Sequence, residues 1–497
     1  MLHFFVILLA AVCAHAGVSD PNFADGRKVI VHLFEWKWAD IGKECQDFLG
    51  PYGYAGVQVS PPSKHITADG YPWWQRYQPV SYSLDGSRSG SEAEFKEMVD
   101  KCNNVGVRIY VDAVIPHGRC PPPPMCGRQD DSYTFPDVPY YPGNFNVPNG
   151  RCSSNSGGID DYSNPDEVRY CNLVGLDDID FSSGLSSTKL VQDYLNKLLG
   201  YGVAGFRIDA AKHMDPTEIE NIANGLQNVF GGRPYIYQEV IDQGGEPIKA
   251  AHYTHLGDVT EFRYCTEIAR VGRGEVDLGY LYNFGESWGM LPSSQAVVFV
   301  DNHDNQRGHG GAGSVVTYTE SAAYKKATAF ALAWDYGTTR IMSSYKFSNT
   351  DQGPPGSNGV TSSPEFNSDS SCKGDWVCEH RWRQIRNMVC FRNAAGTAPV
   401  DNWTTRLSNL ISFSRGSKAF FAISNERSDN CPWLQTGLSG GTYCDLISGD
   451  PTDSGCTGKE IEVQSDGAAQ VCLEAGEDSM VALTYKAKSG SGAGCKW

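Results

Sequence analysis

Eight short runs of apolar, β-forming residues recur along the chain as far as Tyr345, and they limit its possible folds more than any other feature. Most intervals between the runs are long enough to hold a helix, for example residues 92–105 and 187–200. The runs are apolar almost throughout, which is typical of strands covered on both faces. We therefore predict an α/β fold, a (β/α)8 TIM barrel. The eight runs are Val29–Phe34, Tyr54–Ser60, Arg108–Ile115, Val203–Ala210, Pro234–Val240, Asp258–Tyr264, Ala296–Asp304 and Thr339–Tyr345.

One interval is far longer than a single crossover helix requires. About 90 residues separate the third run from the fourth, and they are rich in Pro, Gly, Asn, Asp and Cys with little helical periodicity. Loops of this length within a compact domain are usually functional. We expect residues 118–184 to form an irregular subdomain inserted after strand 3, so that residues 17–117 and 185–401 make up the barrel.

The pattern changes again after about residue 402. Short alternating strands, such as Leu410–Ser414, Ala419–Ser424 and Met480–Thr484, are separated by Gly-rich turns. This pattern predicts a C-terminal all-β sandwich over residues 402–488. Residues 489–497 are Gly- and Ser-rich and read as a flexible tail. Asn402-Trp403-Thr404 is a glycosylation sequon, although such tripeptides also occur by chance.

The N-terminus predicts export from the cell. Residues 1–16 carry a short apolar run followed by Ala14-His15-Ala16, which is typical of a secretory signal peptide. A buried strand or a membrane anchor is the alternative, but neither this run nor any later segment reaches the ~20 apolar residues that span a bilayer. We therefore expect a secreted, extracellular protein with no membrane partner.

An exported chain with 16 cysteines is expected to contain disulfides. Removal of the signal peptide takes away Cys13 and leaves an odd number, and Cys495 in the tail is the candidate for a free or intermolecular thiol. The spacings favour two short loops and two longer ones. These pairs are Cys372–Cys378, Cys444–Cys456, Cys45–Cys102 and Cys152–Cys171.

The composition excludes one class of partner. The net charge is −17 and no basic stripe is present, so nucleic acid is not an expected ligand. Aromatic residues make up 11% of the chain, with 11 Trp and 25 Tyr. That content fits a sugar-binding protein but is weak support, because large cores also use aromatic residues.

Acidic residues stand where several predicted strands end. The fourth run ends near Asp209, the fifth at Glu239 and the seventh at Asp304. Because the carboxyl ends of barrel strands meet at one mouth, these carboxylates should share a cavity. Such a cluster is costly unless chemistry requires it, and glycosidases require two carboxyl groups across the bond they cleave. The alternative is that these acidic residues only form salt bridges at the strand ends. That explanation fits a single acidic residue better than it fits the whole set.

The neighbouring residues suggest different catalytic roles for two of these acids. Asp209 lies two residues from Arg207, hence on the same side of its strand, and is expected to stay ionised as the nucleophile. Glu239 is expected to act as the general acid and then as the general base.

The strand-end segments resemble the four signature blocks of the α-amylase family, in order and with similar intervals; they lie at residues 112–117, 205–213, 237–240 and 299–304. The resemblance covers residues 29–485 and is strongest to the animal, chloride-dependent type. PWWQRYQP at 72–79, DNHDNQRGHG at 301–310 and CEHRWRQ at 378–384 are near-literal matches. This resemblance implies an α-amylase that hydrolyses internal α-1,4-glucosidic bonds of starch, glycogen and maltooligosaccharides. It also implies retention of the anomeric configuration through a covalent glycosyl-enzyme intermediate, and a monomeric enzyme.

The resemblance also implies roles for individual residues. Asp209 corresponds to the nucleophile, Glu239 to the acid/base and Asp304 to a third acid that grips sugar hydroxyls. Further residues match positions that contact the glucan chain. They are Trp73, Trp74, Tyr77 and Gln78 on the donor side, His117 and His303 beside the cleaved bond, and Tyr162, Lys212, His213 and His309 at other subsites.

Two ions are implied as well. Arg207, Asn302 and Arg340 match a chloride site; the alternative is that Arg207 only pairs with Asp209 and Asp112. A structural Ca²⁺ would join the insert to the barrel through the carbonyls of Arg169 and His213 and the carboxylate of Asp178. Pro116 stands where the family usually has Asn and supplies no side-chain oxygen. We therefore expect weakened calcium binding, compensated by water or by a neighbouring carboxylate such as Asp177 or Asp180.

The cysteine pattern departs from the vertebrate type. Asp85 replaces one cysteine of a vertebrate-type bridge, while Cys120 and Cys126, and also Cys431 and Cys472, are expected to pair. Cys265 and Cys390 receive no assignment.

Two competing functions are considered. A non-catalytic α-glucan-binding relative would have lost catalytic carboxylates, and all three are present. A glucanotransferase, branching enzyme or maltase on the same scaffold fits less well, because the chloride residues and the Gly-rich segment after His309 are of the animal amylase type.

Overall fold

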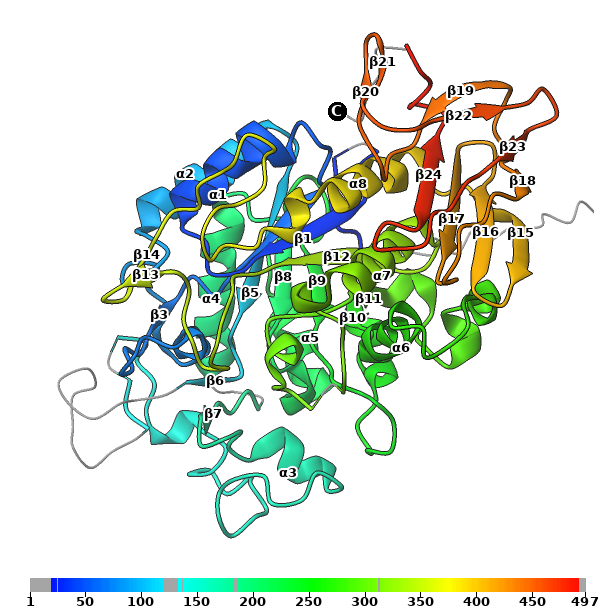
Figure 1. The fold of residues 1–497 in the computed structure, drawn as a ribbon. Helices are drawn as coiled ribbons and strands as arrows, with labels where there is room; N and C mark the ends of the chain where they lie inside the picture. The colour runs from blue at the N-terminus through cyan, green and yellow to red at the C-terminus, as the bar shows by residue number, and fades with distance from the viewer. Residues whose placement is uncertain are drawn as a thin grey trace, which may run out of the picture.

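The computed structural model describes residues 19–24, 26–118, 133–135, 137–182, 186–311 and 313–490. At its centre, eight parallel strands close into a barrel in chain order, and the last strand pairs with the first (Figure 1). Each strand overlaps one predicted run, so the predicted TIM barrel is confirmed. The strands are β1 (Val29–Leu33), β2 (Gly56–Val59), β5 (Arg108–Ala113), β8 (Gly205–Ile208), β9 (Tyr235–Gln238), β10 (Asp258–Thr260), β11 (Ala296–Val298) and β12 (Thr338–Ser343).

The strands are buried on both faces. Val29 and Val31 of β1 belong to the large core beneath the helices, whereas Ile30, between them, packs with Tyr110 and Tyr237 in a separate small cluster. This alternation follows from the two-residue repeat of a strand. The small cluster fills the barrel interior, and the inward-facing layer continues toward the carboxyl ends of the strands with polar groups.

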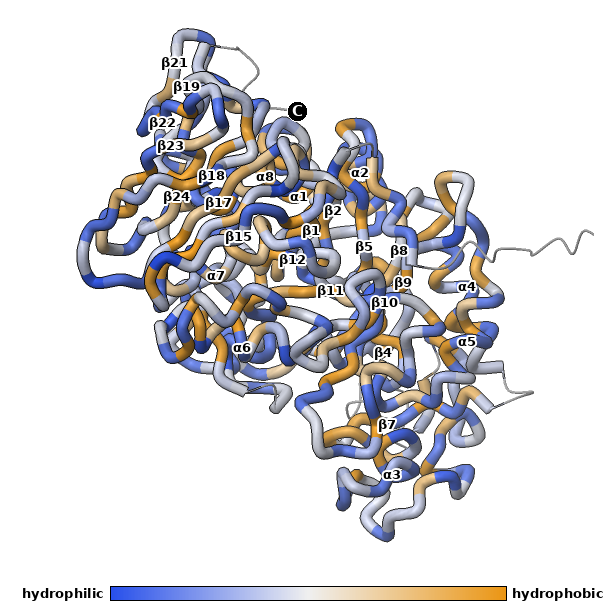
Figure 2. The backbone as a smooth tube through the Cα atoms, turned by 90° about the vertical axis from the view of Figure 1, so that its right-hand side faces the viewer, coloured by the Kyte–Doolittle hydropathy of each residue, from blue (hydrophilic) through white to orange (hydrophobic). Residues whose placement is uncertain are grey.

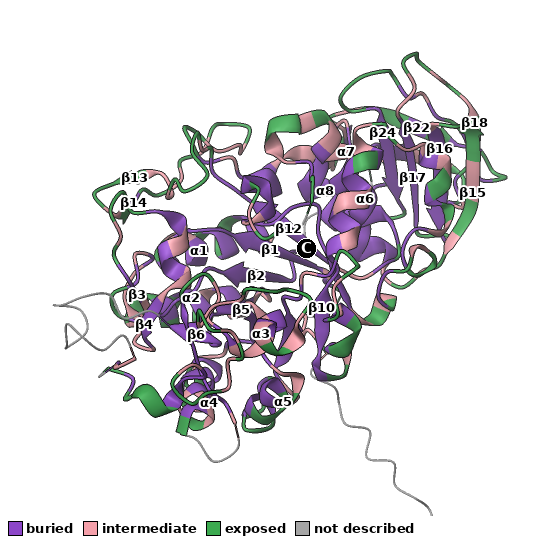
Figure 3. Cartoon of the chain, turned by 90° about the horizontal axis from the view of Figure 1, so that it is seen from below, coloured by how far each residue is buried: buried purple, intermediate pink, exposed green. Residues whose placement is uncertain are grey.

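Helices cover the outside of the barrel, and their buried faces point inward (Figure 3). Helix α2 begins with a capping box between Ser91 and Glu94, and Asp85 accepts a 3.0 Å hydrogen bond from the N–H of Glu92. Asp85 therefore helps to cap this helix. Within the described residues, only 3-10 turns connect β9 to β10. The helices are α1 (Trp38–Glu44), α2 (Glu92–Asn104), α3 (Pro165–Tyr170), α4 (Ser186–Gly200), α5 (Pro216–Asn224), α6 (Phe262–Gly272), α7 (Ser321–Ala333) and α8 (Arg383–Ala395).

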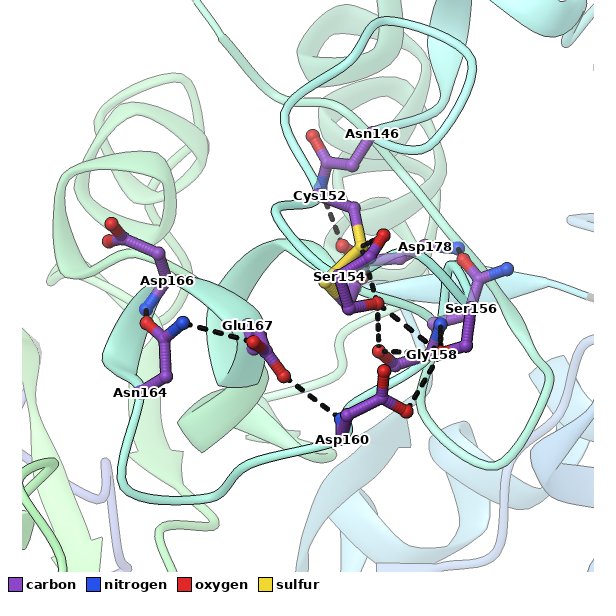
Figure 4. Close-up of a disulfide and its surroundings, with 12 residues drawn as sticks. Asn146, Cys152, Ser154, Ser156, Gly158, Asp160, Asn164, Asp166, Glu167 and Asp178 are labelled. Atoms are coloured by element: carbon purple, nitrogen blue, oxygen red, sulfur yellow. Dashed lines mark hydrogen bonds between the residues drawn. A yellow bond between two sulfur atoms is a disulfide. The ribbon is translucent and has the colours of Figure 1, made fainter.

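The long segment between β5 and α4 forms a lobe at the carboxyl end of the barrel strands, with hydrophilic stretches running through it (Figure 2). It starts with β6 (His117–Gly118), which pairs in antiparallel fashion with β7 (Asp177–Asp178). Figure 4 shows the Cys152–Cys171 disulfide in this lobe, with Asn146 and Asp178 beside it. The disulfide ties the end of α3 to an otherwise irregular chain, so the segment depends on cross-links more than on regular secondary structure.

Two four-stranded antiparallel sheets form the C-terminal all-β domain, in the orders β15-β16-β17-β24 and β18-β23-β22-β19. Phe420 and Leu483 pack toward the second sheet, whereas Phe413 and Phe421 pack against the barrel helices. The first sheet is therefore covered on both sides. Its strands and those of the second sheet are β15 (Val400–Leu407), β16 (Leu410–Arg415), β17 (Ala419–Ser424), β18 (Trp433–Gln435), β19 (Gly441–Cys444), β22 (Glu460–Val463), β23 (Ala468–Gln470) and β24 (Met480–Thr484).

Short two-stranded ribbons complete the set of described strands. They are β3 (Lys64–His65) with β4 (Pro79–Ser81), β13 (Gly356–Ser357) with β14 (Val360–Thr361), and β20 (Pro451–Thr452) with β21 (Gly455–Cys456).

The cysteines follow most of the predicted pairing. Cys45–Cys102, Cys152–Cys171, Cys372–Cys378, Cys444–Cys456 and Cys431–Cys472 are disulfides. Of the two cysteines without an assignment, Cys390 is disulfide-bonded and Cys265 is free and buried. The expected Cys120–Cys126 pair, the expected free thiol of Cys495 and the predicted signal peptide lie outside the described residues. Among the described helices, none has the length and apolar character needed to cross a membrane.

Candidate active site

The three predicted catalytic carboxylates line one cavity of about 580 Å³ at the carboxyl end of the barrel. Asp209 and Glu239 directly follow β8 and β9, and Asp304 lies in the loop after β11. A cavity of about 640 Å³ beside α8 is slightly larger, but it lies away from the strand ends where barrel enzymes carry out their chemistry. Other predicted residues that line the first cavity are Trp73, Tyr77, His117, Tyr162, Lys212 and His213.

Arg207 joins the carboxylates to one another. Its Nη1 atom lies 2.5 Å from an oxygen of Asp112 and 2.7 Å from one of Asp209, while its Nη2 atom pairs with Glu239. The pairing of Arg207 with Asp209 and Asp112, weighed above as the alternative to chloride binding, is thus present, and Glu239 completes the cluster. The second oxygen of Glu239 accepts a 2.9 Å hydrogen bond from the N–H of Ala210. Ala210 adopts a left-handed conformation, with φ 47°, immediately after Asp209.

Burial has the largest effect on the pKa values of Asp209 and Asp304. It raises the pKa of Asp209 well above its ordinary value, and the positive charge of Arg207 opposes the rise. The ionisation of Asp209 therefore depends on both its burial and the charge of Arg207, and a sequence does not show how strongly a group is desolvated. Burial and the charge of Glu239 raise the pKa of Asp304 to about 7.

Aromatic and imidazole rings surround the carboxylates. Trp73 and Tyr77 lie on a 3-10 turn (Trp73–Tyr77), and the hydroxyl of Tyr77 donates a 2.9 Å hydrogen bond to Asp112. The ring of Tyr77 stacks on His303, with 4.9 Å between the centroids, and Nε2 of His303 lies 3.2 Å from a carboxylate oxygen of Asp304. The site can therefore offer ring faces and hydrogen-bonding groups to a polyhydroxylated ligand.

Four predicted substrate contacts do not line the cavity themselves. His303 stands behind Tyr77, and the ring of His309 lies 5.7 Å from that of Trp73, so both support residues that do. Trp74 is partly buried against the core, and Gln78 is partly buried at the end of the same turn.

Sequence reasoning missed several residues that line the cavity. Lys212 donates 2.9 Å to the carbonyl of Ile241 and pairs with Glu246, which places the loop after β9 along one wall. The position of this loop directly after a catalytic strand was a usable signal. The missed residues are Leu173, Val174, Leu176, Ala210, Ile241, Gln243 and Glu246, whereas Gly310 and Gly311, which also line the cavity, belong to the Gly-rich segment noted in the sequence.

The predicted chloride residues fit an anion. Arg207 and Arg340 are 1% and 3% exposed, and within the described part of the chain no carboxylate lies within 4.0 Å of Arg340. Arg340 donates 2.8 Å to the side-chain oxygen of Gln58, whose amide group donates 3.3 Å to Asp112. The Nε atom of Arg207 is buried without a hydrogen-bond partner. Burial, followed by the charges of Arg340 and Arg207, holds the pKa of His32 well below its ordinary value.

The predicted calcium donors form a less complete set. Burial raises the pKa of the Asp178 carboxyl well above its ordinary value, so a cation would be favourable there. However, one of its oxygens accepts a 2.5 Å hydrogen bond from the side chain of Asn146, and the carbonyl of Pro116 is occupied by the N–H of Ile179. Asp180, considered above as a substitute ligand, pairs with Arg151. Among the described residues, no group of three or more acidic, His or Cys side chains could hold a metal ion.

Comparisons with known proteins agree with this geometry. A family model described as the C-terminal all-beta domain of alpha amylase matches residues 401–486. Pancreatic alpha-amylase 2a5 of Mus musculus is 46% identical over 97% of this chain and 99% of its own length, and alpha-amylase of Pecten maximus is 46% identical over 97% and 98%. A solved structure of alpha-amylase I from Eisenia fetida is 44% identical in sequence and has a TM-score of 0.87; the match covers 94% of this chain and 99% of that one. That structure is of a glutamate-to-glutamine variant in complex with maltohexaose. The chain therefore belongs to the α-amylase family and is an α-amylase glycoside hydrolase.

Proposed function

We propose that this α-amylase cleaves internal α-1,4 bonds of starch, glycogen and maltooligosaccharides with retention of configuration, using Asp209, Glu239 and Asp304. The observation that carries the proposal is that Arg207 contacts both Asp209 and Glu239 at the mouth of the barrel. One guanidinium between two carboxyl groups keeps them close, as a double-displacement mechanism with a separation of roughly 5 Å requires. Maltohexaose bound to the Eisenia fetida relative supports an α-glucan substrate.

In the first step, a carboxylate oxygen of Asp209 attacks the anomeric carbon and forms a glycosyl ester. The bond to the glycosidic oxygen breaks, and this oxygen takes the proton of the Glu239 carboxyl group. In the second step, a water molecule gives a proton to Glu239 and attacks the same carbon, which releases the sugar and restores Asp209. Asp304 would hold sugar hydroxyls during both steps, and His303, whose Nε2 lies 3.2 Å from the Asp304 carboxylate, would position that carboxylate.

Arg207 has a stabilising part in this scheme. It offsets the negative charge of Asp209 while that carboxylate approaches the sugar, and it remains paired with Asp112 when Asp209 becomes esterified. Trp73, Trp74, Tyr77 and Gln78 would support the donor side. Tyr162, Lys212, His213 and His309 would contact other parts of the glucan, and His117 the sugar at the cleaved bond.

Two ions and an extracellular location complete the proposal. Chloride would be held by Arg207, Asn302 and Arg340, where it would supply the negative charge that two buried guanidinium groups favour. Calcium would be held by Asp178 and the carbonyls of Arg169 and His213, weakly, because Pro116 offers no side-chain oxygen. The chain would act as a secreted monomer after removal of residues 1–16, with the barrel, insert and sandwich bounded as predicted above.

Replacement of Glu239 tests the mechanism. An amide cannot donate the required proton, so Glu239→Gln should lower kcat on soluble starch by several orders of magnitude while maltohexaose still binds. Glu246→Gln, a matched change in the same cavity, should lower kcat far less. NMR of the first products should show α anomers. Full activity of Glu239→Gln would overturn the assignment of the acid/base.

The ions are tested by measuring activity against chloride concentration, with and without a calcium chelator. Wild type should lose activity in chloride-free buffer, and Arg340→Gln should lose its response to chloride. An unchanged response in Arg340→Gln would contradict the proposed chloride site.

A further inference from the structure

A glutamine lies inside the barrel, among the charged groups below the active-site cavity. Gln58 is the third residue of β2, and its side chain is 0% exposed. The two-step mechanism described above gives it no part. Burying an amide costs free energy unless hydrogen bonds replace its contacts with water, so a fully buried glutamine needs partners at both ends of its amide group.

The two ends of the Gln58 amide have partners of opposite character. Its oxygen accepts a 2.8 Å hydrogen bond from Nη1 of Arg340 and a 2.7 Å hydrogen bond from the hydroxyl of Tyr237. Its nitrogen donates a 3.3 Å hydrogen bond to Oδ2 of Asp112. An arginine can only donate and an ionised carboxylate can only accept, so a side chain between them must do both. A glutamate here would repel Asp112 and a lysine would repel Arg340, whereas glutamine suits both neighbours.

The contacts of Gln58 cross the barrel interior. Its strand, β2, pairs only with β1 and β5 among the barrel strands, and Asp112 lies on β5. Tyr237 lies on β9 and Arg340 on β12, neither of which touches β2 in the sheet. Side chains that point inward from different strands meet in layers within a barrel of this kind. Gln58 therefore joins strands that the backbone ladder leaves apart.

Asp112 passes this constraint to the catalytic groups. Its oxygen that does not face Gln58 lies 2.5 Å from Nη1 of Arg207. The same nitrogen lies 2.7 Å from Asp209, and the other terminal nitrogen of Arg207 pairs with Glu239. Gln58 touches neither catalytic carboxyl group, yet only one carboxylate and one guanidinium separate it from both.

We infer that Gln58 is a positioning residue for the proposed reaction, on which the inference rests. By tying Asp112 to Arg340, it fixes the carboxylate that orients Arg207, and Arg207 in turn holds the two catalytic carboxyl groups. A displacement of about 1 Å at a reacting group can lower a rate about a hundredfold. Substrate binding should be spared, because Gln58 is enclosed in the barrel and does not line the active-site cavity.

Gln58→Met tests the inference, because methionine fills a similar space but makes none of the three hydrogen bonds. Kinetics on maltoheptaose should show kcat lowered about ten- to hundredfold, the loss expected when hydrogen bonds to charged groups are removed, with KM unchanged. Tyr237→Phe removes one of the two donors to the Gln58 oxygen and leaves Asp112 in contact with the amide. It should lower kcat about two- to tenfold, again with KM unchanged.

Tyr110→Phe is the matched control for lost stability. Tyr110 is the register partner of Gln58 on β5 and is equally buried, but its hydroxyl donates to the carbonyl of Pro21, in the segment before β1. This variant also loses a hydrogen bond made inside the barrel. It should lower the thermal midpoint, as Gln58→Met should, while kcat stays at the wild-type value.

Wild-type kcat in Gln58→Met would overturn the inference, and so would a loss of activity that appears in KM instead of kcat. An equal loss of kcat in Tyr110→Phe would overturn it too, because the effect would then follow from stability. If Gln58→Met does not fold, wild-type kcat in Tyr237→Phe decides against the inference. Failure of the proposed mechanism is distinguishable, because it would appear as full activity of Glu239→Gln.

Discussion

Replacement of Arg207 by methionine would leave three buried carboxyl groups without their shared cation. Arg207 is 1% exposed and contacts Asp112, Asp209 and Glu239. At an effective dielectric constant near 20, each contact contributes about 4 kcal/mol of Coulomb attraction. Removing the guanidinium also removes the cost of burying it, so we expect the free energy of unfolding to fall by about 3–5 kcal/mol near neutral pH.

The loss should depend on pH, with a sign that follows from protonation. Without Arg207, burial raises the pKa values of Asp112 and Asp209 further above those of the unfolded chain, so the folded state binds more protons. A carboxyl group of this kind stabilises the fold below its unfolded pKa, and that stability disappears as the pH rises toward its folded pKa. The deficit of Arg207→Met should therefore grow from pH 5 to pH 8, by about 1.4 kcal/mol per pH unit for each proton taken up.

Urea unfolding followed by tryptophan fluorescence at pH 5, 6.5 and 8 measures this deficit. Arg340→Met is the matched control. Arg340 is similarly buried, and within the described residues it contacts Gln58, Tyr237 and the ring of Phe299 but forms no ion pair with a carboxylate. Its loss of stability should change little with pH. An Arg207→Met deficit that stays constant or shrinks as the pH rises would refute the reasoning.

Two further predictions concern other buried charges. Arg151 lies 2.6 Å from Asp180 in the insert and 2.8 Å from Glu218 on α5, so Arg151→Met should lower the free energy of unfolding by about 2–3 kcal/mol and speed proteolysis of the insert. Arg151→Lys should restore part of that stability. Equal proteolysis rates for wild type and Arg151→Met would contradict this prediction. Burial raises the pKa of Glu379 to about 7, so wild type should lose stability as the pH rises from about 4.5 to 7. Glu379→Gln stays neutral and should gain stability over wild type across that range, and parallel pH profiles of the urea midpoint would argue against it.

The barrel could be predicted from the sequence because its strands carry a local signal. Each strand is a short apolar run, and the carboxylates of Asp209 and Glu239 follow directly where two of these runs end. Strand order and parallel pairing then bring them together without any knowledge of the loops. Four cysteine pairs were also predictable, because their spacing along the chain is consistent with closed loops.

The remaining features depend on tertiary contacts. Desolvation of Asp209 outweighs its pairing with Arg207, and neither spacing nor composition reveals that balance. Asp85 is a helix-capping residue only because its loop passes the start of α2. Val174 gives no signal as a residue type, and its left-handed conformation and its place in the cavity lining are visible only in the structure.

The insert links these features to catalysis. It contributes to the lining of the cavity, and it is held to the barrel both by an apolar core that includes Phe145, Val168 and Ile179 and by charged pairs. Arg151 joins it to Glu218, and Arg169, 3.2 Å from Asp215, joins it to the residue that caps the start of α5. Both contacts lie on the same barrel helix, so a shift of α5 would move Tyr162 and Val174 relative to Asp209. Two arginine pairs therefore help to set the position of the insert relative to α5.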